Sequence, residues 1–330
     1  MSLPSTLIQL FKTNNTTSVL GYLSRRPDLI RNPELLGRAV RHGNLEMVRK
    51  LYDMGVQNVQ EAIGYIVYGR KRDIAEFLIA KGADPLLGDE HEPVPVGACE
   101  VLNSYALKMS IKLSGNQLPD DVAGNCLAML LSTYSRNPSE KRKCFKVLSK
   151  YGVKIPDSPP LLVHQSDLSG LRQKIHQNRS LLEQRFSERE IYPEQLGILP
   201  GDGLHLTPLN NSTLLHLATE LNDLPLMQML LEEGADPNAR THTVRRDGSG
   251  HTPLFHTVVS YTPNNTDRAQ LLLDYGADPT LKVRIRKQLK YMDDEALEQP
   301  MQFNKVGLKE YAEAFPVRYW VSEPTLKLLP

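Results

Sequence analysis

The chain has 330 residues, of which 40% are hydrophobic and 23% charged, values typical of a folded protein rather than a disordered one. Its 39 lysines and arginines nearly balance 38 aspartates and glutamates, so the net charge is +1 and the strong basic excess of a nucleic-acid-binding protein is absent. Aromatic residues make up only 6%, which predicts a core of small aliphatic side chains, as in stacked helices.

The cysteines, the apolar stretches and the N-terminal residues bear on whether the protein is disulfide-bonded, zinc-binding, membrane-spanning or secreted. Cys99, Cys126 and Cys144 form no C-x-x-C pair and are odd in number, so we expect reduced thiols and neither a zinc site nor a disulfide framework. No stretch approaches the ~18 apolar residues of a membrane span. Met1 to Leu10 lacks the basic region of a signal peptide. We therefore expect a cytoplasmic protein with no metal and no cofactor.

The first half of the chain has apolar residues at helical spacing. One helix ends in Gly82-Ala83-Asp84-Pro85, where glycine ends the helix and proline prevents its continuation. Weaker forms of this ending occur at Gly55-Val56 and Gly152-Val153. The predicted helix pairs lie near 5–30, 34–55, 59–82 and 97–152, the last being one long, divergent repeat with helices near 97–113 and 121–150.

A basic cluster lies on the last of these helices. It consists of Lys141, Arg142, Lys143 and Lys146. We interpret it as an ordinary solvated helix face.

The second half repeats the same helix ending at Gly234-Ala235-Asp236-Pro237 and at Gly276-Ala277-Asp278-Pro279. A start phrase comes before each of these helix pairs, namely Thr213-Leu214-Leu215-His216-Leu217-Ala218 and Asp247-Gly248-Ser249-Gly250-His251-Thr252-Pro253-Leu254. The predicted helix pairs lie near 161–186, 212–234 and 252–276.

The start phrases resemble the ankyrin motif D-x-x-G-x-T-P-L-H-x-A, and the endings resemble its G-A-D-P-N ending. The resemblance implies an all-α ankyrin-repeat solenoid with short β-hairpin loops. In that family the threonine and histidine join the start of the first helix to the neighbouring repeat. The resemblance therefore implies a structural role for His216.

The second half is also similar to a group of uncharacterised bacterial ankyrin-repeat proteins. The residues that carry this likeness are Glu190–Gly197, Thr213–Ala218, His251–Phe255, Arg286–Leu289, Glu310–Ala312 and Trp320–Pro324. The likeness implies a bacterial source, and the group carries no assigned enzymatic activity.

Three parts follow from this organisation. We expect divergent ankyrin-like repeats over 1–156, ankyrin repeats over 157–281 and a C-terminal capping extension over 282–330. The exposed apolar end of a repeat array requires a cap. We expect Phe315 and Trp320 in the extension to cover it.

The loop Asn238–His251 is the candidate recognition site. It is longer than the ankyrin standard and rich in arginine, which is enriched at binding hot spots. In ankyrin proteins the hairpin tips and the exposed side of the first helices bind the partner. The predicted protein-binding residues are Glu220, Leu221, Arg240, His242, Arg245, Arg246, Gly248, Ser249 and His251. The alternative is a mobile surface loop.

Other residues have a structural interpretation that we favour. Leu215, Leu230 and Leu231 are expected in the core. The basic stretch 282–290 could bind nucleic acid or acidic lipid, but we favour a segment that buries Val283, Ile285 and Leu289 and leaves its charges in water. Asp202, His205 and Asp247 are polar loop residues. No nucleophile elbow, P-loop or metalloprotease motif accompanies them, so we expect no catalysis.

The sequence therefore predicts a monomeric scaffold that binds one protein partner through its hairpin tips and concave face. One alternative is an immunity-type inhibitor of a toxin, or an effector secreted into a host cell. From another class, the alternative is an enzyme of unknown activity that uses loop 197–211 or the tail 281–330.

Overall fold

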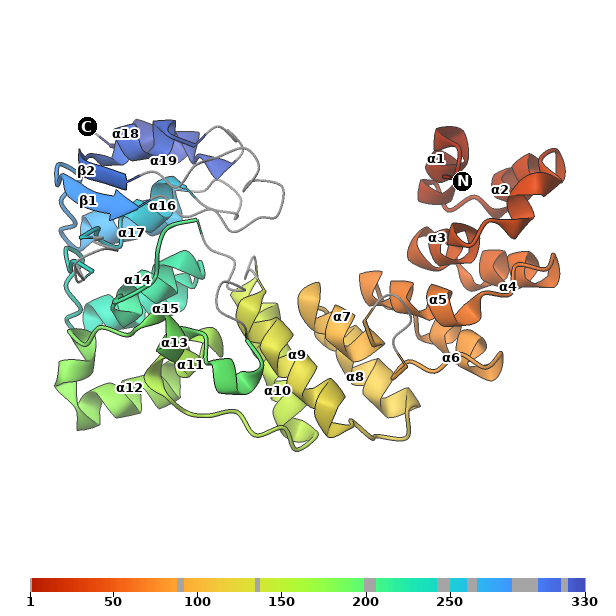
Figure 1. The fold of residues 1–330 in the computed structure, drawn as a ribbon, viewed down its shortest axis with the longest axis horizontal. Coiled ribbons are helices and arrows are strands. Elements are labelled where there is room, and N and C mark those ends of the chain that lie inside the picture. The colour runs from red at the N-terminus through yellow and green to blue at the C-terminus, as the bar shows by residue number, and fades with distance from the viewer. Residues whose placement is uncertain are drawn as a thin grey trace. The chain divides into compact units, whose positions relative to one another are not determined.

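The computed structural model describes residues 2–87, 92–133, 137–198, 206–241, 250–259, 266–286, 302–315 and 320–329. Within them the regular structure is helical apart from one two-stranded sheet (Figure 1). The chain divides into two compact units, Met1–Leu130 with Lys146–Val153 and Leu131–Phe145 with Lys154–Pro330. None of the helices in these ranges has the length and apolar character needed to span a bilayer.

The first unit is built from helix pairs (Figure 1). The first helices contact one another in sequence, and the first three of the second helices do the same. The first helices are α1 (Ser5–Lys12), α3 (Glu34–His42), α5 (Val59–Ile63) with the 3-10 helix η2 (Gly64–Tyr68), and α7 (Val94–Glu100). The second helices are α2 (Thr16–Ser24), α4 (Leu45–Asp53), α6 (Arg72–Ala80) and α8 (Ser104–Leu113), and the 3-10 helix η1 (Pro27–Arg31) follows α2.

The second unit, taken by itself, has the same kind of arrangement. Its first helices are α11 (Pro159–His164), α14 (Leu214–Glu220) and α16 (Phe255–Val258), and its second helices are α12 (Leu168–Gln177), α15 (Leu224–Glu232) and α17 (Asp267–Asp274). Short elements η3 (Arg179–Leu182), α13 (Glu188–Ile191) and η4 (Glu194–Leu196) lie between α12 and α14. Contacts of α14 with α16 and of α15 with α17 place the predicted pairs 212–234 and 252–276 side by side, as expected.

Most second helices begin with a polar cap that the sequence encodes locally. The side-chain oxygen of the residue before the helix accepts a hydrogen bond from a backbone N–H in the first turn, at distances of 2.9–3.2 Å. These caps satisfy donors that have no partner inside the helix. The capping residues are Asn15, Asn44, Asn103, Asp167 and Asp223.

The glycines predicted to end the second helices adopt the left-handed conformation, with φ between +87° and +99°. They are Gly55, Gly82, Gly152, Gly234 and Gly276. The N–H of the residue after each glycine donates to a carbonyl five residues earlier, as from Ala235 to Leu230 at 2.9 Å. This hydrogen bond closes the helix end, and glycine is favoured there because it has no Cβ to clash with the backbone.

The divergent segment contains four helices where two were expected. The predicted helix 97–113 is divided into α7 and α8 at Leu102, which has φ +54°. The predicted helix 121–150 is divided into α9 (Asp120–Ser132) and α10 (Pro138–Lys150). Asn137 caps α10, with its side-chain oxygen 3.1 Å from the N–H of Glu140.

The basic cluster on α10 is not a uniformly solvated face, so that interpretation was wrong for one of its members. Lys141 is only 1% exposed, and its Nζ lies 3.5 Å from both the Thr133 carbonyl and Nδ1 of His164. Burial lowers the pKa of Lys141 to about 7. Nε2 of His164 donates to the Ile191 carbonyl at 3.1 Å, which leaves Nδ1 free to accept from the lysine.

The C-terminal extension caps the last repeat, as expected. Strands β1 (Val283–Arg286) and β2 (Gln302–Val306) pair antiparallel, with Val283 opposite Val306. Helices α18 (Leu308–Glu313) and α19 (Glu323–Leu328) both contact α16. The Ser322 N–H donates to the Val258 carbonyl at 2.9 Å, and Phe315 and Trp320 are buried.

Candidate functional site

The loop between α15 and α16 leaves and rejoins the second unit at one closed stem. The Thr241 N–H donates to the His251 carbonyl at 3.0 Å, and Thr241 Oγ1 lies 3.3 Å from Nδ1 of His251. The Gly250 N–H donates to the carbonyl of Arg284 in β1 at 2.7 Å. Both Thr241 and His251 are buried. The two ends of the loop are therefore fixed to the body of the unit.

Arg240 lies immediately before this stem and is exposed, as predicted for a binding residue. Its carbonyl accepts a hydrogen bond from Nε of Arg185 at 3.0 Å, and Arg185 is exposed as well. Arg185 was missed by the sequence reasoning, because it lies 55 residues earlier in an irregular segment without a repeat motif. The structure thus brings two exposed arginines together at the base of the loop.

The remaining loop residues of the predicted site lie outside the described residues. They are His242, Arg245, Arg246, Gly248 and Ser249. The same holds for Asp202, His205 and Asp247.

Glu220, Leu221 and His251 were expected on an exposed face, but the structure places them in the interior. They are 1%, 5% and 0% exposed. The backbone of Leu206 lies against the carboxyl of Glu220, and that of Pro208 lies against the imidazole of His251. The chain's own segment 206–209 therefore covers the side of α14 that the sequence reasoning assigned to a partner.

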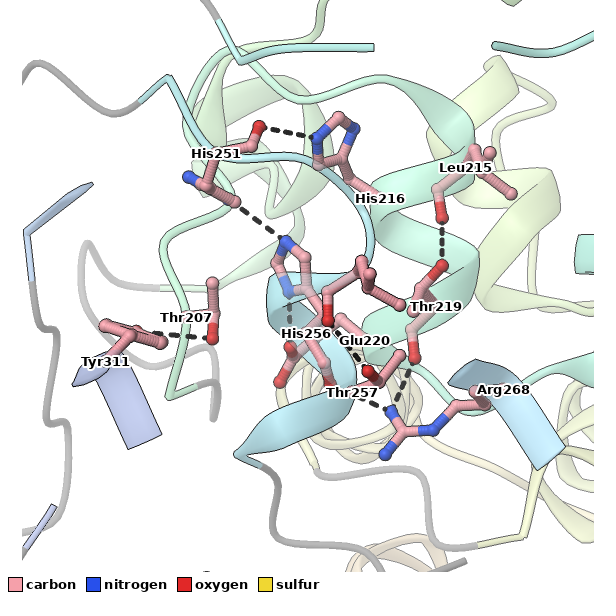
Figure 2. Close-up of polar contacts among 11 residues, drawn as sticks. Thr207, Leu215, His216, Thr219, Glu220, His251, His256, Thr257, Arg268 and Tyr311 are labelled. Carbon is pink, nitrogen blue, oxygen red and sulfur yellow. Dashed lines mark hydrogen bonds and ion pairs between the residues drawn. The ribbon is translucent and has the colours of Figure 1, made fainter. Parts of the chain in front are cut away.

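His216 joins consecutive repeats, as the ankyrin resemblance implies. It is fully buried, and its Nε2 donates to the His251 carbonyl at 3.2 Å (Figure 2). Its Nδ1 then accepts from Thr213 Oγ1 at 2.8 Å. The contact connects the start of α14 to the segment that leads into α16.

A second buried chain of hydrogen bonds connects the first helices of these repeats (Figure 2). Glu220 Oε2 lies 2.6 Å from Nδ1 of His256, and Nε2 of His256 lies 3.1 Å from Nε2 of His251. Nη1 of the buried Arg268 donates to the carbonyls of Thr219 at 2.8 Å and His256 at 3.2 Å. Polar groups buried in this way stabilise a structure only when they are paired.

Burial favours the neutral form of these groups. It raises the pKa of Glu220 to about 8, although the Arg268 guanidinium opposes the rise. It lowers the pKa of His256 to about 3, and the positive charge of Arg268 lowers it further. The pKa values of His216 and His251 also lie well below the ordinary value, chiefly because of burial. Burial therefore favours a neutral carboxyl on Glu220 and a neutral imidazole on His256.

The tail completes the cover over this network. Tyr311 of α18 is fully buried, and its hydroxyl lies 3.4 Å from Thr207 Oγ1. Its ring contacts that of Phe255, with centroids 5.7 Å apart. Burial raises the pKa of the Tyr311 hydroxyl. A general acid or base must reach the atom that it protonates or deprotonates, and these groups are enclosed by the chain itself. The geometry assigns them to holding the repeats together.

The structure also bears on the metal site, the cysteines and the basic stretch considered from the sequence. Within the described ranges no group of three or more His, Cys, Asp or Glu side chains is placed to hold a metal ion. Cys99, Cys126 and Cys144 are buried. In the basic stretch 282–290, Val283 and Ile285 are buried while Lys282 and Arg284 are exposed, which agrees with the structural interpretation of this stretch. Residues 287–290, which include Leu289, lie outside the described residues.

Comparison with known proteins agrees with this geometry. Residues 193–283 match the family model described as "Ankyrin repeats (3 copies)". The chain is 38% identical over 74 residues to the ADP-ribosylation factor GTPase-activating protein AGD4 of Arabidopsis thaliana, covering 22% of this chain and 8% of that protein. It is 24% identical over 208 residues to the transient receptor potential cation channel subfamily A member 1 of Homo sapiens, covering 61% and 17%. The chain thus spans less than a fifth of either relative.

Two solved structures are similar in fold at low scores. The human ASB11 ankyrin repeat domain has a TM-score of 0.31 and 16% identity, covering 82% of this chain and 96% of that one. The ankyrin repeat domain of Bcl-3 has a TM-score of 0.24 and 16% identity, covering 75% and 88%. The assignment is carried by the family match together with the helix pairs, glycine endings and Thr213–His216 contact described above. Residues 193–283 of the chain are therefore assigned to the ankyrin-repeat family.

Proposed function

We propose that the chain is a scaffold that holds one protein partner through the hairpin edge of its ankyrin repeats, centred on residues 240–249 with Arg185. Ankyrin repeats are generally protein–protein interaction modules, and proteins of this family and fold are typically non-enzymatic scaffolds. The observation that supports the proposal is the closed stem of Thr241 and His251, which carries exposed arginines at its base.

A fixed stem favours binding because less conformational entropy is lost when the loop meets its partner. Arginine offers a planar fork of donors that matches carboxylates and backbone carbonyls. The proposed contact set combines Arg240 and Arg185 with the loop residues His242, Arg245 and Arg246. It omits Glu220, Leu221 and His251, because buried side chains cannot touch a partner.

The test is a quantitative capture experiment with the full chain and a charge-reversed loop, Arg245→Glu with Arg246→Glu. A protein retained by the wild type and depleted about tenfold by the loop variant supports the proposal. The matched control is Lys146→Glu with Lys150→Glu, which makes the same charge change at exposed positions of α10. Both variants should keep the wild-type circular dichroism spectrum. Equal recovery of every captured protein by the wild type and the loop variant would contradict the proposal.

The immunity-type inhibitor and the host-directed effector are two biological forms of the same proposal, with a toxin or a host protein as the partner. An adjacent toxin or secretion gene would favour one of them. The bacterial source, the cytoplasmic location and the monomeric state stay predictions, as do the three sequence-based domain boundaries. Light scattering on the purified chain tests the monomer directly, since a mass of twice 37.2 kDa would contradict it.

A further inference from the structure

Cationic side chains converge at the end of α3 in the first unit. Arg38, Arg41 and His42 lie in or next to the last turn of this helix. The next repeat adds Lys71, whose Nζ donates to the carbonyl of Gly43 at 2.9 Å. Lys12 ends the preceding first helix, α1. We refer to Lys12, Arg38, Arg41, Arg70 and Lys71, together with His42 and Tyr68, as the basic face.

His42 reports the electrostatic potential of this face. Burial lowers its pKa below the ordinary value, and Arg41, Arg38, Lys12 and Lys71 lower it further. The geometry agrees, because α1 contacts α3 and Lys71 donates to the Gly43 carbonyl at the end of α3. The cations of three consecutive repeats therefore act at one place.

Nearby carboxylates neutralise only part of this charge. Glu34 pairs with Arg38 at 3.2 Å, and Asp73 raises the pKa of Lys71 against the effect of burial. Among the carboxylates in the described ranges, none forms an ion pair with Lys12, Arg41 or Arg70. The basic face therefore has a positive excess in a chain whose net charge is only +1.

Aromatic rings hold the arginines in place. The guanidinium of Arg41 lies 4.0 Å from the ring centroid of Tyr68, which is 45% exposed. The guanidinium of Arg70, which lies two residues after Tyr68 in the sequence, is 5.2 Å from the ring centroid of Tyr105. A guanidinium over a ring keeps its N–H groups directed outward from its edge, where they can bind carboxylates in pairs. Less side-chain entropy is then lost on binding.

We propose that the basic face binds an extended acidic segment of a protein partner, with aspartate and glutamate carboxylates on Arg41, Arg70 and Lys71. Charge complementarity selects this partner. A single-stranded nucleic acid would need free aromatic faces for its bases to stack on. Arg41 already covers one face of Tyr68, and Tyr65 is packed against Gly37, where an added Cβ would lie 2.5 Å from the ring.

This inference rests on the proposed function only in taking the partner to be a polypeptide. The basic face belongs to the first unit, whereas residues 240–249 belong to the second. The two surfaces can therefore be tested separately in the same full-length chain.

The experiment measures the anisotropy of a fluorescein-labelled dodecapeptide of alternating glutamate and aspartate as the full chain is added. We expect saturable binding that weakens as salt rises from about 50 mM to about 300 mM, because the contacts are ionic. The variant Arg41→Glu with Arg70→Glu should weaken binding about tenfold or more. A peptide of alternating glutamine and asparagine should not bind. In NMR titrations the acidic peptide should raise the pKa of His42, because it neutralises the surrounding cations.

The matched control is Arg49→Glu with Lys81→Glu. These cations also lie over aromatic rings of the first unit, at 5.6 Å from Phe77 and 4.9 Å from Tyr52. Arg49 lies in the second helix α4, and Lys81 directly follows the second helix α6. Equal loss of binding with both variants, tighter binding of a labelled single-stranded dodecanucleotide, or an unchanged pKa of His42 would overturn the proposal. Arg245→Glu with Arg246→Glu should leave the peptide affinity unchanged, so failure of the loop proposal would not be mistaken for failure of this one.

Discussion

Replacement of Glu220 by glutamine tests whether the buried network is neutral. Glutamine keeps the shape and the hydrogen-bonding capacity of the neutral acid but does not titrate. The carboxyl of Glu220 lies 2.6 Å from His256 and is shielded from water. If burial keeps the acid protonated, the wild type and Glu220→Gln should differ in stability in a way that depends on pH.

The direction and size of this dependence follow from the pKa of Glu220. Burial raises that pKa from 4.5 to about 8, so the folded state binds the proton more tightly than the unfolded state. The resulting stabilisation is fully present below pH 4.5 and is lost as the pH rises towards about 8. Each pH unit in this interval removes about 1.4 kcal/mol, which gives an upper limit of about 5 kcal/mol over the whole interval.

Urea unfolding of both proteins at a series of pH values measures the difference. His164, His216, His251, His256 and Lys141 also titrate abnormally, but they are present in both proteins, so the difference isolates the part that depends on Glu220. We expect the advantage of the wild type over Glu220→Gln to shrink from pH 4.5 to 8. If Glu220 and His256 formed an ion pair, the folded pKa of Glu220 would lie below 4.5, and the advantage would instead shrink as the pH falls below that value. That result would refute the neutral network.

Three further predictions concern stability. His216→Ala should lower the melting temperature measured by circular dichroism, because it removes the contacts of 2.8 Å to Thr213 and 3.2 Å to the His251 carbonyl; an unchanged melting temperature would contradict its structural role. Leu230→Ala, at a fully buried position, should reduce the free energy of unfolding in urea by about 2–5 kcal/mol, and a loss below about 0.5 kcal/mol would place this residue outside the core. Deletion of 301–330 should cause aggregation or early melting in light scattering, whereas a soluble, cooperatively melting truncation would contradict the cap.

Local features of the fold could be predicted from the sequence because their causes are local. A glycine after a leucine-rich helix is enough to predict a left-handed helix end, as found at Gly82, Gly234 and Gly276. The division of 97–113 could not be predicted in this way. There Leu102 adopts φ +54°, a conformation that a branched aliphatic residue seldom takes and that no motif marks.

Burial of the charged residues depends on segments distant in the chain. Glu220 occupies an outward position in the repeat motif, and only the structure shows that 206–209 covers it. Lys141 has basic neighbours that indicate solvent, yet its helix turns it towards His164. Arg268 was missed for the same reason, since its partners are backbone carbonyls of α14 and α16. A pattern along one helix does not reveal what another segment lays over it.

Of the candidate binding surfaces, one part could be predicted from the sequence and the rest could not. The long arginine-rich loop was visible in the sequence because its length departs from the repeat. The partnership of Arg240 with Arg185 and the convergence of Lys12, Arg41 and Lys71 arise only when the repeats stack. These cations come from separate segments of the sequence, and within the basic face only Arg70 and Lys71 lie in a short basic run, Arg70–Arg72.

The stacking of repeats is tested most directly by NMR of the His216 side chain. We predict that the proton on its Nε2 exchanges slowly with water and shows nuclear Overhauser contacts to residues 251 and 252, because it donates to the His251 carbonyl in the next repeat. Rapid exchange of this proton, with contacts only inside its own helix pair, would contradict the stacking of repeats on which the proposed loop surface depends.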